Sequence, residues 1–100
     1  MIIAIESPGE VRILEAGHLK RCSVSIGLGV QDAEARTALT DFGELDGDFA
    51  WLAIDELRNR ASVGMPGSWL DQFQAMIDYA AEHGWVDESR GAVRAHVARG

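Results

Sequence analysis

The sequence predicts one α+β domain over residues 1–100, in which a mostly antiparallel sheet carries a long amphipathic helix at about 68–83. Three observations support this fold class. Apolar residues recur at helical spacing over 69–81, apolar and small residues alternate over 22–30, and further short β-rich segments stand on both sides of them. One or two shorter helices are expected to pack with the long helix on one face of the sheet.

The N-terminal third of the chain predicts three strands. An Ile-rich run precedes a turn at 7–10 that contains Pro and Gly, and a β-rich segment returns from it, so residues 2–14 are expected to form a hairpin. The segment CSVSIGLGV at 22–30 gives the clearest strand, because Val, Ile and Leu alternate with Ser and Gly. Its small-residue face leaves room for a helix backbone or a ligand to lie close.

The middle of the chain is less regular. Residues 32–41 fit either a short helix or a continued strand, and we expect the helix. The apolar run FAWLAI at 49–54 fits a buried strand, and a short helix is expected to follow it over 55–61. Residues 92–98 alternate between apolar and polar side chains and give the last predicted strand.

The long helix has predicted start and stop signals. Ser68 is a suitable N-cap, with Asp71 at the position of the capping-box acid. Gly84 can adopt the left-handed conformation that ends a helix, and Trp85 is then expected to fold back on the last turn. The apolar stripe of this helix is expected at positions 69, 70, 73, 76, 77, 80 and 81.

Charge and composition exclude several classes of function. The net charge is −7 with a pI near 4.7, and the nine cationic residues are spread along the chain, so we expect neither nucleic-acid nor membrane binding. No apolar run approaches the length of a membrane span. The single cysteine, Cys22, cannot form an internal disulfide and favours a reducing compartment, so a cytoplasmic protein is expected.

No catalytic, cofactor-binding or metal-binding motif is complete. Gly27-Leu28-Gly29 is followed by Asp32 where a dinucleotide fingerprint has its third glycine. The acids at 41–48 do not fit the register of a calcium-binding EF-hand loop, although a metal loop of another kind stays open. We therefore predict no cofactor, and no catalytic or metal-ligating residue.

Five residues are candidate contacts for a partner or ligand. Trp51 is a large aromatic residue that the long helix does not need, and Asp46 and Asp48 lie in the acidic segment just before it. Arg94 and His96 share the outward face of the last predicted strand, which makes them candidate polar contacts.

Two functions follow from these features. The first is a non-enzymatic protein-interaction module, most simply a homodimer, because the strand at 22–30 carries no charge that would resist pairing with a second copy. A basic protein partner of the acids within 41–56 belongs to the same class. The alternative is a small-molecule-binding or minor catalytic domain that uses a cleft beside 22–30, with Arg94 and His96 as polar contacts.

Overall fold

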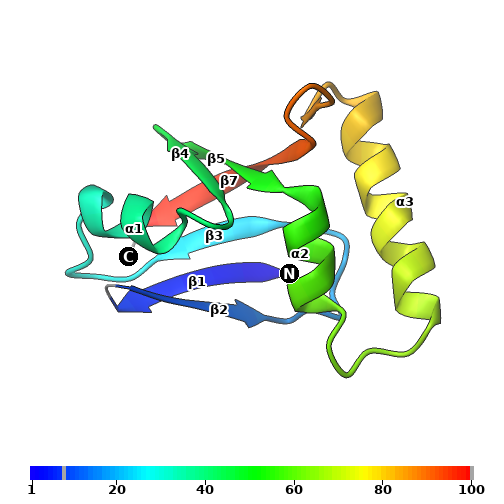
Figure 1. Ribbon diagram of the computed structural model, residues 1–100, viewed down its shortest axis with the longest axis horizontal. Coiled ribbons are helices and arrows are strands. Elements are labelled where there is room, and N and C mark those ends of the chain that lie inside the picture. Colours follow the sequence, from blue (N-terminus) through cyan, green and yellow to red (C-terminus); the bar gives the residue numbers. More distant parts are fainter. Residues whose placement is uncertain (8, 100) are drawn as a thin grey trace.

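The computed structural model describes residues 1–7 and 9–99, so Pro8 of the predicted turn lies outside the described residues. These residues form an α+β fold, a curled sheet of seven strands with three helices (Figure 1). The elements, in chain order, are β1 (Ile2–Ser7), β2 (Glu10–Leu14), β3 (Ser23–Ile26), α1 (Asp32–Ala38), β4 (Gly43–Asp46), β5 (Phe49–Ala53), α2 (Ile54–Ala61), α3 (Ser68–Glu82), β6 (Val86–Asp87) and β7 (Ala92–Arg99).

The sheet is mixed, which corrects the expectation of a mostly antiparallel one. Its strand order is β2-β1-β3-β7-β5-β4, and the short β6 also pairs with β7. The two pairings at the centre, β1 with β3 and β3 with β7, are parallel, and the others are antiparallel. Parallel neighbours need long connections, and here the chain between β3 and β7 contains all three helices.

The strand predicted at 22–30 is shorter and lies inside the sheet. β3 ends at Ile26, and both of its edges are paired, one with β1 and the other with β7. Because both edges are paired within the protein, β3 has no open edge for a second copy, although it carries no charge. This removes one argument for a homodimer. The true edge strands, β2 and β4, each carry charged residues, and such charges protect an edge from pairing.

One face of the sheet carries the core. Val24 of β3 pairs with Val97 of β7, and Leu52 of β5 pairs with Val93 of β7, so these four side chains share one face, and all are buried. Side chains of all three helices and of the loop after α1 complete this buried cluster: Ala35, Leu39, Phe42, Leu57, Ala61, Trp69, Phe73, Ile77 and Ala80. Burial of this apolar area is the main source of stability for the fold.

The three helices are not all stacked on one face. In Figure 1, α2 lies over the near face of the sheet, whereas α3 runs along one end of the strands. α3 packs against β6 and β7, and the indole Nε1 of Trp69 donates a hydrogen bond to the carbonyl oxygen of Ala16 at 2.8 Å. α3 therefore closes the end of the core.

The start of α3 differs from the prediction, and its end agrees with it. Gly67 occupies the N-cap and makes no side-chain cap bond, so Ser68 does not cap the helix. The buried positions are Trp69, Phe73, Ile77 and Ala80, whereas Leu70 and Ala81 of the expected stripe are exposed.

Gly84 has φ +75°, and the amide of Trp85 donates to the Ala80 carbonyl at 2.9 Å, as the predicted helix stop requires.

The predicted hairpin at the N-terminal end and the helix within 32–41 are both present, as β1–β2 and α1. Two short strands were not predicted. β4 has the sequence GELD, and β6 has only two residues, so neither carries an apolar alternation that would reveal it.

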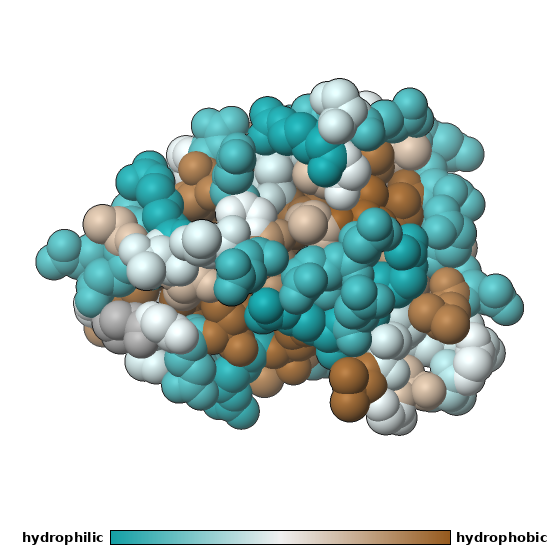
Figure 2. Space-filling view, viewed as in Figure 1, coloured by the Kyte–Doolittle hydropathy of each residue, from teal (hydrophilic) through white to brown (hydrophobic). Residues whose placement is uncertain are grey.

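The surface is largely polar where the helices cover the sheet. Figure 2 shows hydrophilic residues over most of this side of the molecule, with smaller hydrophobic areas between them. Within residues 1–7 and 9–99, none of the helices combines the length and apolar character that a bilayer span requires.

Candidate functional site

The face of the sheet opposite the core gathers several side chains that the core does not use. Ser23 of β3 and Phe49 of β5 both pair with His96 of β7, and Trp51 of β5 pairs with Arg94. Paired residues point to the same face of a sheet. None of these five side chains is fully buried. We call this surface the open face.

A cavity of about 580 Å³ lies where the open face meets α3. Its walls come from β3, β5 and β7, from α3, and from the segments that precede β3 and follow α3. Its lining residues are Lys20, Arg21, Cys22, Ser23, Phe49, Met76, Tyr79, Ala80, Trp85, Val93, Arg94, His96 and Ala98. We call it the first cavity.

The first cavity concentrates the unpaired positive charge of the protein. Five of the nine cationic side chains form ion pairs with carboxylates: Arg12, Arg58, Arg60, Arg90 and Arg99. Of the other four, which form no ion pair within the described part of the chain, Lys20, Arg21 and Arg94 line the first cavity, and only Arg36 lies elsewhere.

No Asp or Glu occurs among the residues described as lining the first cavity, although 16 of the 100 residues are acidic. The cavity is therefore a locally positive site on a protein of net charge −7.

Aromatic side chains hold the polar groups of the cavity in place. The guanidinium carbon of Arg94 lies 4.3 Å from the centre of the Phe49 ring, and the His96 ring meets Phe49 edge-on at 6.0 Å. The backbone amide of Arg94 also donates to the Trp85 carbonyl at 2.8 Å, which ties β7 to the end of α3. Tyr79 stands beside Trp85, with ring centres 6.1 Å apart.

Cys22 is a neutral part of the cavity wall. Burial raises the pKa of its thiol to about 11, which outweighs the opposing effect of the positive N-terminus. The thiol therefore stays protonated at neutral pH, where it neither repels an anion nor acts as a ready nucleophile.

Arg94 and His96 thus lie beside the small-residue face of the strand in 22–30, where the sequence predicted a cleft. Trp51 lies on the same face but outside the first cavity, where the Arg90 guanidinium carbon is 5.3 Å from its ring centre. Asp46 pairs with Phe49 at the β4 edge of the sheet, and it does not line the cavity either. Their roles as contacts stay predictions.

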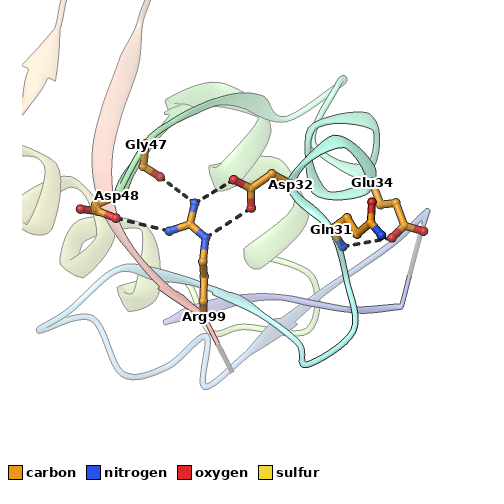
Figure 3. Close-up of polar contacts among 6 residues, drawn as sticks. All are labelled: Gln31, Asp32, Glu34, Gly47, Asp48 and Arg99. Carbon is orange, nitrogen blue, oxygen red and sulfur yellow. Dashed lines mark hydrogen bonds and ion pairs between the residues drawn. The ribbon is translucent and has the colours of Figure 1, made fainter.

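Asp48 belongs to a different cluster. Figure 3 shows the Arg99 guanidinium between Asp32 at the start of α1 and the turn that contains Gly47 and Asp48. Its nitrogens meet the two Asp32 oxygens at 3.3 Å each, the Gly47 carbonyl oxygen at 2.9 Å and one Asp48 oxygen at 3.4 Å. This arrangement fastens the end of β7 to α1 and to the β4–β5 turn, a structural task.

The acidic segment 41–56 is largely neutralised by the protein itself. Four of its six acids form ion pairs: Glu44 with Arg90, Asp48 with Arg99, Asp55 with Arg58, and Glu56 with Arg60. These pairs reduce the negative field that a basic partner would meet. Across the described residues, no three His, Cys, Asp or Glu side chains gather in a way that could hold a metal ion.

Neither a protein-family model, nor a curated protein, nor a solved structure matches this chain. The geometry of the site therefore has to carry the functional argument.

Sequence reasoning missed several lining residues. Lys20 and Arg21 lie in an irregular segment with no periodic signal, and Tyr79 lies off the buried stripe of α3. Trp85 was expected only as the helix-stop contact. The sequence did contain one indication of this site, because Lys20 and Arg21 are the only two cationic residues that are adjacent in this acidic sequence.

Proposed function

We propose that this protein binds a small organic anion with an apolar body in the first cavity. The observation that carries the proposal is that three of the four unpaired cations line one cavity that has no carboxylate in its described lining. This is the small-molecule-binding alternative that the sequence offered, with the charge of the ligand now specified.

The chemistry of the lining suits such a ligand. Arg94 is only partly exposed, and its guanidinium can donate two parallel hydrogen bonds to one carboxylate. Lys20 and Arg21 add positive charge at the exposed rim. Met76 and Trp85 offer apolar surface for the body of the ligand, as in most small-molecule sites. The proposal is one of binding, not catalysis.

Calorimetric titration with 1-naphthoate tests the proposal, with neutral 1-naphthamide as the matched ligand. We expect naphthoate to bind at least about tenfold more tightly than the amide, because a charge-assisted hydrogen bond contributes about 1.5–3 kcal/mol. Equal affinities for the acid and the amide would overturn the proposal.

A pair of protein variants locates the site. Arg94→Gln should weaken naphthoate binding by about tenfold or more, since it removes the guanidinium from the cavity. Arg36→Gln should leave the affinity unchanged, because Arg36 is the unpaired cation that lies on α1 and not in the cavity. Equal losses in both variants would mean that only the net charge of the protein matters.

Self-association is a second candidate function, supported by a different observation. Phe49 is 36 % exposed on the open face, and the half-buried Trp51 lies two residues further along the same face of β5. Such a face could pair with the same face of a second copy. Sedimentation across micromolar concentrations tests this, and a mass that stays near 10.9 kDa would exclude the homodimer.

We also propose that the protein is cytoplasmic. Its support is that Cys22 is the single cysteine of this sequence, so the sequence contains no internal disulfide that would need an oxidising compartment. Fractionation of cells that produce the full protein would test it.

A further inference from the structure

We infer that the ligand of the first cavity is an elongated monocarboxylate with a straight apolar tail, as in a free fatty acid. This inference rests on the proposed function and specifies its ligand. The observation behind it is a second cavity of about 650 Å³ that borders the first. Both cavities share Lys20, Met76 and Tyr79 in their linings.

The second cavity continues along α3, away from the strands. Its lining residues are Gly17, His18, Leu19, Lys20, Gln72, Ala75, Met76 and Tyr79. As in the first cavity, none of these described residues is Asp or Glu, although α3 carries Asp71, Asp78 and Glu82 at other positions. The two cavities together form a trough without carboxylates between α3 and the segment 17–23.

The distribution of charge gives the trough a direction. Arg21 and Arg94 line the first cavity only, whereas the second has no arginine in its described lining. A carboxylate head therefore belongs in the first cavity, and an uncharged tail belongs in the second. Lys20 stands at the border, where its aliphatic stem can lie along a tail while its ammonium group faces the head.

The length of the trough favours an extended ligand. Gln72 lines the second cavity and Ala80 lines the first, so the trough follows α3 over nine residues, which span about 12 Å. A compact aromatic acid fills only one of the two cavities. The shared Met76 and Lys20 have long, adaptable side chains, which can move to let a narrow tail pass between the cavities.

A peptide fits the trough less well than an acyl chain. An extended peptide needs a sheet edge or many polar groups to satisfy its backbone amides. The strands with an open edge are β2, β4 and the short β6, and none of them contributes a lining residue to either cavity. A straight hydrocarbon tail has no such requirement.

The test compares butanoate, octanoate and dodecanoate below their micellar concentrations. Each methylene that enters the trough should tighten binding by about fourfold, so affinity should rise steeply from butanoate to dodecanoate. Dodecanol, which lacks the charge, should bind at least about tenfold more weakly than dodecanoate.

A substitution in the second cavity completes the test. Ala75 and Ala81 are both exposed alanines of α3, but only Ala75 lines the second cavity. Ala75→Phe should weaken dodecanoate binding by at least about tenfold, while naphthoate binding in the first cavity stays unchanged. Ala81→Phe is the matched control and should alter neither ligand.

The outcomes separate this inference from the proposed function. If naphthoate binds through Arg94 but affinity is flat from butanoate to dodecanoate, the elongated ligand is wrong and the anion site stands. The same holds if Ala75→Phe leaves dodecanoate affinity intact. If neither naphthoate nor any fatty acid binds, both proposals are wrong.

Discussion

The two faces of the central sheet use the same strands for opposite purposes. On β7, Ala95 and Val97 are buried in the core, whereas the alternate residues Arg94 and His96 line the first cavity from the open face. On β5, Leu52 is fully buried while Phe49 remains 36 % exposed. A strand has a period of two, so one stretch of sequence can specify a packed side and a binding side independently.

If the first cavity binds a ligand as proposed, stability and ligand affinity should respond to substitutions on different faces of the sheet. Substitutions on the core face should lower the free energy of unfolding, because they remove buried contacts. Substitutions on the open face should change ligand affinity and leave the fold intact.

The largest loss of stability is expected at Phe73 of α3. Its ring is fully buried and stacks on Trp69, with centroids 5.1 Å apart, so Phe73→Ala should cost about 3–5 kcal/mol in a urea melt. The neighbouring Gln74→Ala, which removes only an exposed hydrogen bond to Asp78, should cost less than about 0.5 kcal/mol. Similar losses at both positions would contradict the buried stripe of α3.

The two faces can be compared directly on β5. Leu52→Ala leaves a cavity in the core and should cost about 2–5 kcal/mol. Phe49→Ala removes a larger side chain from the open face but should cost only about 1 kcal/mol, mostly the stacking of Arg94. A greater loss at Phe49 than at Leu52, measured by chemical denaturation, would reverse the assignment of the faces.

The reactivity of Cys22 tests whether this residue is buried in the wall of the first cavity. Burial raises the pKa of its thiol from 9.0 to about 11, so the folded protein should hold about a hundredfold less thiolate near pH 7 than the unfolded chain. Alkylation by iodoacetamide should slow by about that factor in the native state, relative to the protein in urea.

The same shift of the Cys22 pKa has a consequence for stability. The pKa of the Cys22 thiol is higher in the folded protein than in the unfolded chain. Its contribution to the free energy of unfolding is therefore fully present below pH 9.0 and is lost as the pH rises through about 11. A native thiol that reacts as fast as the unfolded one would show that Cys22 is not held in a buried wall.

The smallest effect is expected at Gly84, which lies outside both faces. Its φ of +75° is unfavourable for a residue with a Cβ, so Gly84→Ala should cost about 1 kcal/mol. A Cβ there meets no atom within 4 Å, so the cost comes from the backbone alone. Gly17→Ala is the matched control, because a Cβ on Gly17 also meets no atom within 4 Å and Gly17 does not have a positive φ. A gain in stability at Gly84 would mean that the helix continues through it.

Local patterns allowed much of the fold to be predicted from the sequence. The hairpin of β1 and β2, the strand within 22–30 and the helix stop at Gly84 all depend on neighbouring residues. The parallel pairing of β3 with β7 could not be predicted, because it joins residues about 70 positions apart and leaves no local signal. The predicted N-cap of α3 was wrong, because Gly67 occupies the position that Ser68 was expected to fill.

The candidate site was predictable only where it lies on a regular strand. Alternation identified Arg94 and His96 as outward-facing residues of the last strand. The register places His96 beside Ser23 of β3 and Arg94 beside Trp51 of β5. Lys20 and Arg21 come from an irregular segment, whose position is set by the packing of distant elements. Periodicity therefore located one wall of the cavity but could not indicate which segments close it.

The place of β7 in the sheet has a consequence for synthesis of the protein. β2, β1 and β3 pair among themselves, as do β4 and β5, and only β7 joins these two groups. A ribosome makes residues 92–99 after the other strands, so the strand that joins the two groups is absent until that point. During this interval β3 and β5 each present an uncharged edge that has not yet met β7, so Ser23–Ile26 and Phe49–Ala53 are open to pairing with other chains before folding is complete.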